Sequence, residues 1–376
     1  MNTKILHIQK KNRTHVETFS KLEDFDYLEG EAIDPTTVIK NPNISLYCLD
    51  IQNQRAIFVE TPLDIDLSQA PFFYQSQYNH AQKLIAVPFS ELSQLLESIE
   101  TIKNMVIIYS VGRCGSTLLS KVFNQVDTVV SLSEPDVFSQ IVGMRNPDGS
   151  NDNEIAALLK ICLYLVSKPT SLETQSHCVI KLRSFCIELG DLIYSIRPDA
   201  KVIFLYRNLE DVINSFLRAF VFIGSLLPTI EENIELYSRF FPLLKHYAND
   251  IDFTDSNAID FYTIMWLSAM ECYLKLYQKN MVSFAIRYED LVKHQESIIT
   301  SIFKYCGLPT AEVSNACSVF NKDAQKGSNL SQETTRNNKI DQPDILDIRQ
   351  KVSKLLEKHP EIKTSDFIVP GILQFR

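Results

Sequence analysis

The residues best suited to chemistry lie together in one short segment, VIIYSVGRCGSTLLSKVF. An apolar run of strand length leads into the segment, and a helical pattern follows it. Glycines allow backbone angles that point successive N–H groups into one concavity, and a helix start adds free N–H groups and the positive end of its dipole. We therefore predict a phosphate or sulfate site formed by Gly112, Arg113, Cys114, Gly115, Ser116 and Thr117.

The segment differs from the ATP-binding loop of P-loop kinases and ATPases. That loop ends in Gly-Lys-Ser or Gly-Lys-Thr, whereas Gly115 is followed directly by Ser116. The difference disfavours an ATPase or kinase. The alternative without function is a glycine turn with Arg113 in a surface ion pair.

A second group of residues follows the apolar run VIFLY, in the segment VIFLYRNLEDVINSFLR. Arg207 stands at the end of the predicted strand, where ligands of open α/β sheets bind, and Ser215 lies on the next helix. The pair could hold a second phosphate group. The alternative is an arginine that caps carbonyl groups and a serine that faces solvent.

Glu134, in SLSEPDVF, follows a short apolar run. A carboxylate can serve as a general base if burial raises its pKa toward neutrality. A glutamate before a proline could equally mark the start of a helix and take no part in the chemistry.

The elements that must position these side chains alternate between strands and helices from about residue 105 onward. This pattern is typical of an α/β protein with a doubly wound, mainly parallel sheet flanked by helices. The predicted central strands are Met105 to Ser110, Cys178 to Leu182, Val202 to Tyr206 and Met281 to Arg287. Later helices are predicted at Ile230 to Tyr247, Asp260 to Lys279 and Ile345 to Lys358, and a loop at Asp323 to Gln342.

The first hundred residues have a different texture. ISLYCLDI and RAIFVET alternate like the two strands of a hairpin, and a helical pattern with aromatic residues follows. We predict an N-terminal α+β module of unknown role over 1–100 and a nucleotide-binding domain over 101–376.

Composition limits the function classes. The net charge of −9 gives no basic stripe, so nucleic acid is not an expected partner. The eight cysteines form no Cys-x-x-Cys pair, which disfavours a zinc cluster and a dense disulfide framework and favours a reducing compartment. The sequence also lacks an apolar stretch long enough for a membrane span. We therefore expect a cytoplasmic protein without a bound metal.

The glycine segment resembles the 5′-phosphosulfate loop of sulfotransferases that use 3′-phosphoadenosine 5′-phosphosulfate. Arg207 and Ser215, eight residues apart, resemble the second family element, and IRYEDLVKHQESIITSIFKYCGLP resembles the third. The resemblance covers Met105 to Pro309. It implies a fold like that of P-loop nucleoside-triphosphate hydrolases and sulfuryl transfer from this nucleotide without a metal.

The resemblance also implies roles for single residues. Arg113 and the loop N–H groups would stabilise the departing 5′-phosphate, Arg207 and Ser215 would bind the 3′-phosphate, and Tyr288 would lie near the adenine. Glu134 resembles the base of carbohydrate-directed and tyrosine-directed relatives.

Lys181 and Arg183 occupy the stretch where cytosolic relatives carry a catalytic histidine. They are either crevice walls that bind the transferred sulfate or an anionic acceptor, or structural ion-pair partners.

Three positions depart from the cytosolic relatives. Arg113 replaces a lysine, Leu118 replaces a tryptophan that stacks on adenine, and Gln325-Lys326-Gly327-Ser328 matches a late Lys-Gly motif only weakly. We expect a sulfotransferase acting on a hydroxyl or amine of a small-molecule or glycan acceptor. The alternatives are a P-loop phosphotransferase for a small metabolite and a non-enzymatic scaffold that keeps the nucleotide fold.

Overall fold

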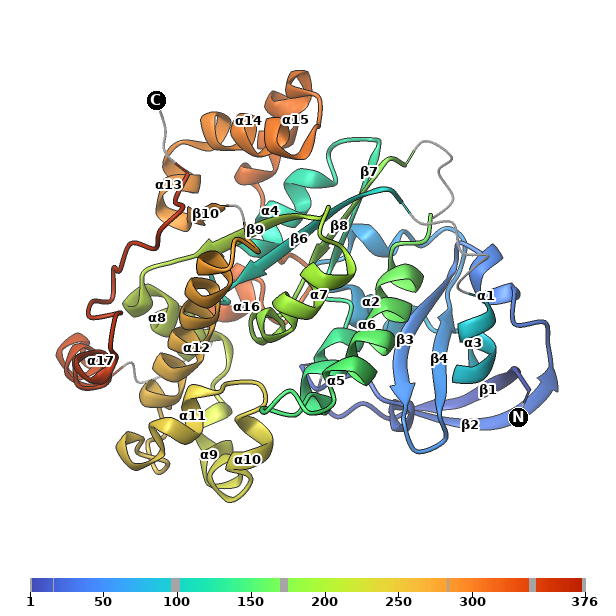
Figure 1. Ribbon diagram of the computed structural model, residues 1–376, viewed down its shortest axis with the longest axis horizontal. Coiled ribbons are helices and arrows are strands. Elements are labelled where there is room, and N and C mark those ends of the chain that lie inside the picture. The colour runs from blue at the N-terminus through green and yellow to red at the C-terminus, as the bar shows by residue number, and fades with distance from the viewer. Residues whose placement is uncertain are drawn as a thin grey trace.

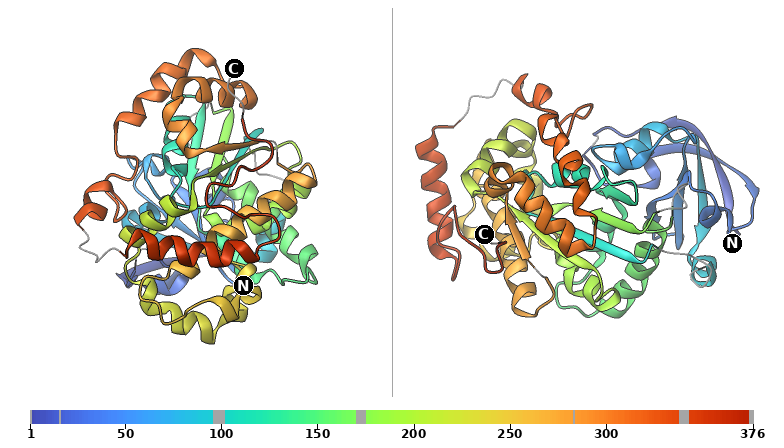
Figure 2. Two further views of the ribbon diagram at one scale, coloured as in Figure 1. Left: turned by 90° about the vertical axis from the view of Figure 1, so that its left-hand side faces the viewer. Right: turned by 90° about the horizontal axis from the view of Figure 1, so that it is seen from above.

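Two five-stranded sheets form the framework of the chain, one from its N-terminal residues and one from later residues (Figure 1). The computed structural model describes residues 2–15, 17–95, 102–169, 175–282, 284–337 and 343–373. The first sheet lies at one end of the long axis of the molecule (Figure 1), and the C-terminal helix lies near the other end (Figure 2).

The N-terminal sheet is antiparallel, with the strand order β2-β1-β5-β4-β3. Its strands are β1 (Lys4–Lys11), β2 (Phe25–Ala32), β3 (Ile44–Asp50), β4 (Arg55–Glu60) and β5 (Lys83–Pro88). The hairpin predicted from ISLYCLDI and RAIFVET is the β3–β4 pair. The helices of this part are α1 (Thr37–Lys40), α2 (Phe73–His80) and α3 (Phe89–Leu95). The predicted boundary near residue 100 falls in 96–101, outside the described residues.

The second sheet is parallel in all its described strand pairs, with the order β10-β9-β6-β8-β7. Its strands are β6 (Asn104–Ser110), β7 (Val129–Ser133), β8 (His177–Lys181), β9 (Lys201–Tyr206) and β10 (Phe284–Arg287). Within this sheet, the central strand β6 comes first in the chain. Strands β7 and β8 follow on one side of it, and β9 and β10 then follow on the other side. This reversal is a topological switch point, where ligands of such sheets bind. The predicted doubly wound α/β fold is confirmed.

Helices cover both faces of the parallel sheet. In Figure 1, α4, α14 and α15 lie above the sheet, and α7 and α12 lie below it. The helices of this part are α4 (Ser116–Phe123), α5 (Val137–Met144), α6 (Asp152–Val166), α7 (Gly190–Ile196), α8 (Leu209–Ala219), α9 (Ile223–Glu232), α10 (Ile234–Tyr237), α11 (Leu243–His246), α12 (Ile259–Gln278), α13 (Tyr288–Lys293), α14 (Gln295–Cys306), α15 (Val313–Cys317), α16 (Gln332–Asn337) and α17 (Ile345–Lys358).

Several predicted boundaries differ from the observed ones. The helix predicted at 230–247 is divided into the end of α9, then α10 and α11, and Pro242 caps α11 because its missing N–H cannot continue a helix. The strand predicted from residue 281 begins at Phe284, and Ser283 lies outside the described residues. The loop predicted at 323–342 contains the short helix α16, and 338–342 are likewise not described. Strand β7 was not predicted, because two serines interrupt its short apolar run.

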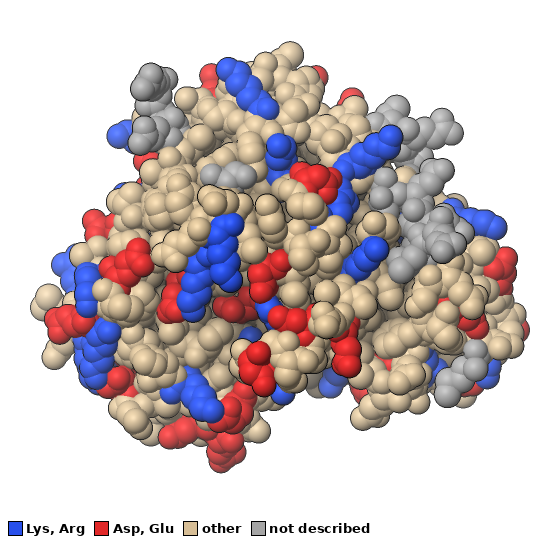
Figure 3. Space-filling view, viewed as in Figure 1, with Lys and Arg blue, Asp and Glu red and all other residues tan. Residues whose placement is uncertain are grey.

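Basic and acidic side chains are interspersed over the face drawn in Figure 3. No single helix in the described ranges is long and apolar enough to cross a membrane, and α8 with α9 meets that requirement only as a pair bent by 102°.

The two sheets share one apolar core. A continuous cluster joins Leu46 and Phe58 of the N-terminal sheet to Val106 and Ile108 of the central strand β6. Burial of this interface stabilises both parts, because each would otherwise expose apolar surface to water.

Lys168, just after α6, adds a polar connection between the two parts. Its buried Nζ donates hydrogen bonds to the carbonyl oxygens of Val38 at 2.6 Å, Asn41 at 2.9 Å and Ile44 at 2.5 Å. Burial lowers the pKa of Lys168 to about 7. The three carbonyl groups lie where α1 ends and β3 begins, so one side chain satisfies all three.

We predict that Lys168→Met destabilises the protein by about 3 kcal/mol, because it leaves buried carbonyl groups without donors. The measurement is the free energy of unfolding in urea. Lys160→Met, an exposed lysine of α6, is the control and should change stability by less than about 0.5 kcal/mol. Equal effects of the two substitutions would contradict a structural role for Lys168.

Candidate active site

The predicted glycine loop connects the central strand to a helix at the switch point of the sheet. Strand β6 ends at Ser110 and α4 begins at Ser116. Gly112 and Gly115 have φ angles of 79° and 83°, in the left-handed region that glycine adopts without strain. The chain therefore turns sharply and presents the N-terminal N–H groups of α4 to the crevice.

Tyr288, the first residue of α13, packs directly against this loop. A Cβ atom at Gly115 would lie 2.6 Å from the Tyr288 ring, so the close approach requires glycine. The Tyr288 ring also contacts a positive charge, because the Arg207 guanidinium lies 4.8 Å from the ring centre. The loop, the end of β9 and the start of α13 thus meet at one point.

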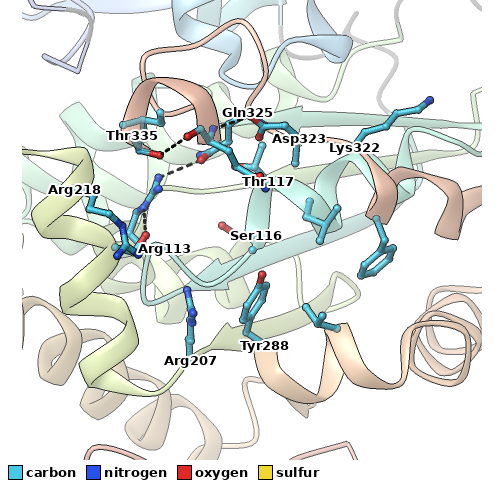
Figure 4. Close-up of a pocket in the computed structure, with 18 of the residues that line it drawn as sticks. Arg113, Ser116, Thr117, Arg207, Arg218, Tyr288, Lys322, Asp323, Gln325 and Thr335 are labelled. Atoms are coloured by element: carbon cyan, nitrogen blue, oxygen red, sulfur yellow. Dashed lines mark hydrogen bonds between the residues drawn. The ribbon is translucent and has the colours of Figure 1, made fainter. Parts of the chain in front are cut away.

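A first cavity of about 580 Å³ opens beside this junction. Of the residues predicted from the sequence, it is lined by Arg113, Gly115, Ser116, Thr117, Arg207, Ser215 and Tyr288. Figure 4 shows Arg113 and Arg207 reaching the same space from different elements. The Arg207 guanidinium pairs with Asp211 through Nη2 at 3.4 Å, but its buried Nε has no hydrogen-bond partner among the described residues, although a buried donor normally has one.

Arg113 bridges the elements around this cavity. Its Nε donates to the Ser215 hydroxyl at 3.0 Å, and its Nη1 donates to Oε1 of Gln325 at 3.2 Å (Figure 4). Burial, together with the nearby charges of Arg207 and Arg218, lowers the pKa of Arg113 to about 10, which leaves it charged at neutral pH.

The structure adds cavity residues that the sequence reasoning missed, namely Arg218, Lys322 and Arg336. Arg218 lies three residues after Ser215 on α8, so helical spacing could have indicated it. Lys322 and Arg336 lie in a part of the sequence without a regular pattern. Lys326, which the late Lys-Gly motif suggested, is not among the residues that line the cavity.

Cys114 has a different environment from its neighbours in the loop. Its side chain is fully buried, and its thiol donates to the carbonyl oxygen of Leu205 at 3.2 Å. The side chain faces the sheet, and Cys114 is not among the residues that line the cavity beside the loop.

Glu134 follows β7 at the same edge of the sheet and adopts a left-handed φ of 60°. Its carboxylate forms a close ion pair with Lys181 and lies 3.7 Å from Nε of Arg183. Burial alone would raise the pKa of Glu134, but the charges of Lys181 and Arg183 outweigh burial and lower it. The condition stated for a base at this position, a pKa raised toward neutrality by burial, is therefore not met, because these two cations stabilise the ionised form.

Lys181 and Arg183 are ion-pair partners, which was one of the two roles considered for them. Besides Glu134, Arg183 contacts Asp136, with Nε 3.0 Å from Oδ1, and its Nη1 donates to the backbone oxygen of Glu17 at 3.0 Å. The two cations are thus matched by two carboxylates, one of which, Asp136, was not predicted.

A second cavity, of about 630 Å³, lies on the Glu134 side of the loop. Gly112, Glu134, Lys181 and Arg183 line its inner end. Arg113, Ser116 and Leu330 line both cavities, so the two spaces adjoin at the glycine loop. In the described part of the chain, no group of three His, Cys, Asp or Glu side chains is arranged to hold a metal ion.

Comparison with known proteins identifies a family. The family model of the sulfotransferase domain matches residues 103–359. No curated protein matches the sequence.

Solved structures similar to this chain share little sequence with it. A sulfotransferase from Alicyclobacillus acidocaldarius is 13% identical over 68% of this chain and 94% of its own, with a TM-score of 0.36. Sulfotransferase STF9 from Mycobacterium avium is 10% identical over 73% of this chain and 82% of its own, with a TM-score of 0.41. Mouse sulfotransferase SULT7A1, solved in complex with PAP, is 12% identical over 72% and 84%, with a TM-score of 0.31.

We predict that Gly115→Ala destabilises the protein more than Gly307→Ala does. Gly307 has a similar φ of 74° but open space around it, so its substitution carries only the backbone cost of about 1 kcal/mol. Contact with Tyr288 should add about 2 kcal/mol at position 115. Urea unfolding measures both losses. The added loss should shrink in the Gly115→Ala/Tyr288→Ala double variant, and equal losses in the two single variants would refute the packing argument.

Proposed function

This chain belongs to the sulfotransferase domain family and is a sulfotransferase, and we propose that its donor is 3′-phosphoadenosine 5′-phosphosulfate. In this proposal the first cavity binds the nucleotide and the second binds the acceptor. The acceptor would receive the sulfuryl group on a hydroxyl or amine. The observation that carries the proposal is that the two cavities adjoin at Arg113 and Ser116.

The first cavity has the chemistry that a nucleotide with two separate phosphate groups requires. One anion site consists of the N–H groups at the start of α4 with the Ser116 and Thr117 hydroxyls. The other consists of Arg207, whose buried Nε lacks a partner, with Ser215 and Arg218 on the next helix. The Tyr288 ring would contact the adenine. When bound, the nucleotide would supply the sulfuryl group and a phosphate leaving group.

The residues between the cavities suit an in-line transfer. Glu134 would accept the proton that the acceptor loses as its oxygen or nitrogen bonds to sulfur. On the opposite side, Arg113 and the loop N–H groups would stabilise the charge left on the 5′-phosphate when the sulfur–oxygen bond breaks. Arg113 fits this role because it stays charged and lines both cavities.

The ion pairs of Glu134 determine what kind of base it can be. Lys181 and Arg183 keep the carboxylate ionised, which is the form that accepts a proton, but they also make it a weaker base than a carboxylate with a raised pKa. The position of Glu134 in the second cavity, beside Gly112 and Ser116 of the loop, supports its assignment.

We predict that adenosine 3′,5′-bisphosphate binds without metal and more tightly than ATP with magnesium. Arg207→Ala should weaken its binding at least about tenfold, because a charge-assisted contact to phosphate is lost. Arg197→Ala is the control, since Arg197 precedes the same strand, β9, and pairs with Asp199 at 2.8 Å. Calorimetric titration of all three proteins measures both effects. Tighter binding of ATP with magnesium would favour a phosphotransferase instead.

We also predict that Glu134→Gln lowers turnover by about a hundredfold or more while nucleotide affinity stays within about twofold. Turnover is measured as bisphosphate released from the donor in the presence of acceptors, with exposed Glu154→Gln as the control. Unchanged turnover would support the scaffold alternative.

The pH dependence of the wild-type enzyme gives a further check on Glu134. Because the pKa of Glu134 is lowered, the base stays ionised through neutral pH. Activity should therefore fall through this group only at a pH below the ordinary pKa of a glutamate. An acidic limb near neutrality would exclude Glu134 as the base in its observed environment.

A further inference from the structure

We propose that the N-terminal module forms one wall of the acceptor site and thereby selects an uncharged, largely hydrocarbon or aromatic alcohol. Here the module means the described residues 2–15 and 17–95, which lie outside the family match at 103–359. The inference rests on the proposed function, because it takes the second cavity as the acceptor site.

The module supplies side chains to that cavity from two segments. Phe19 comes from the connection after β1, and Phe72 and Tyr74 come from the start of α2. Phe19 packs on Phe185 and Phe240 of the parallel-sheet part, with ring centres 5.7 and 5.3 Å apart. Side chains of the module therefore form part of the lining of the second cavity.

The same residues hold the charged inner end of the cavity. The Arg183 guanidinium lies 4.4 Å from the ring centre of Tyr74 and 5.4 Å from that of Phe19. The Lys181 ammonium lies 5.7 Å from the ring centre of Phe72. Both cations of the Glu134 network are thus covered by aromatic rings from the N-terminal module.

The charges at this inner end are already paired. Glu134 and Asp136 neutralise Lys181 and Arg183. Arg113 lines both cavities, but its hydrogen bonds go to Ser215 and Gln325 of the first cavity. His15 and Glu17 are the other titratable groups of the module at the cavity. An anionic acceptor would therefore have to compete with a buried carboxylate for its counter-ion, which is costly.

Most of the remaining lining residues are apolar. The parallel-sheet part contributes Phe216, Phe220, Phe241, Phe261 and Met265.

Two hydroxyl groups of the lining are engaged within the protein. The Tyr262 hydroxyl donates to the Phe220 carbonyl oxygen at 3.1 Å, and that of Ser225 donates to the Phe222 carbonyl oxygen at 2.6 Å. A sugar would bury several hydroxyl groups against these walls without partners, whereas a hydrocarbon body with one reacting hydroxyl would not.

The exposed part of the second cavity is also largely apolar, and residues from both parts of the chain meet there. The ring of His15, from the module, stacks on Phe222 with centres 6.1 Å apart. Phe222 and Leu226 are each 39% exposed, and neighbouring Val221 is 52% exposed. Phe222 and Leu226 line the same cavity as Glu134, so its partly exposed portion also offers apolar contact to an acceptor.

The test is calorimetric titration of the full chain, saturated with adenosine 3′,5′-bisphosphate, with 2-naphthol and with cellobiose. We expect 2-naphthol to bind and cellobiose not to bind. Phe72→Ala should weaken 2-naphthol binding at least about tenfold, because an aromatic contact is lost, and leave bisphosphate affinity unchanged. Phe19→Leu should weaken it less. Tyr27→Ala, an aromatic residue of β2 outside the cavity, should have no effect.

The outcomes separate this inference from the proposed function. The inference is wrong if cellobiose binds and 2-naphthol does not. It is also wrong if the 2-naphthol affinity of both Phe72→Ala and Phe19→Leu stays within twofold of the wild-type value. Unchanged bisphosphate affinity shows that each variant is folded. If the bisphosphate fails to bind the wild type, the proposed function fails, and 2-naphthol titration without nucleotide still tests the wall by the same comparison.

Discussion

Arg183 is a largely buried cation. Much of the arrangement around the second cavity follows from the need to place carboxylates, carbonyl oxygens and aromatic rings next to its guanidinium. Its partners come from distant parts of the chain: Asp136 at the start of α5, the backbone of Glu17, and the ring of Tyr74 on α2. Leaving one buried charge without its partner costs several kcal/mol, on the order of 3 to 5. The N-terminal module and the edge of the parallel sheet are therefore held in one relative position at the point where Glu134 stands.

The site also contains two strained backbone positions. Arg113 and Glu134 are the two non-glycine residues of the site with left-handed φ angles, 50° and 60°. Each follows a strand, so the turn carries its side chain into the crevice beyond the sheet edge. A left-handed residue other than glycine costs about 1 kcal/mol. The hydrogen bonds of Arg113 and the ion pairs of Glu134 can offset that cost.

The two cavities differ in chemistry on either side of one loop. The first cavity is lined by several arginines and by the start of α4, whereas the second is lined by aromatic rings around a neutralised ion-pair network. Such a division suits a reaction whose donor is strongly anionic and whose acceptor is not. It also explains how a chain with a net charge of −9 can bind an anion, since the positive charge is local.

Local sequence patterns predicted the parallel sheet and the glycine loop between β6 and α4, because continuous apolar runs and a glycine turn before a helix are local signals. Arg207 and Ser215 were found in the same way, from one strand and the helix after it. The interrupted strand β7, the division of 230–247 into short helices and the lowered pKa of Glu134 were not predicted. The tertiary structure was needed to show that Lys181 and Arg183 pair with carboxylates some fifty residues earlier. It was also needed to show that Phe19, Phe72 and Tyr74 line the second cavity. Electrostatic environment and cavity walls depend on distances through space between residues far apart in the chain, and no local pattern encodes those distances.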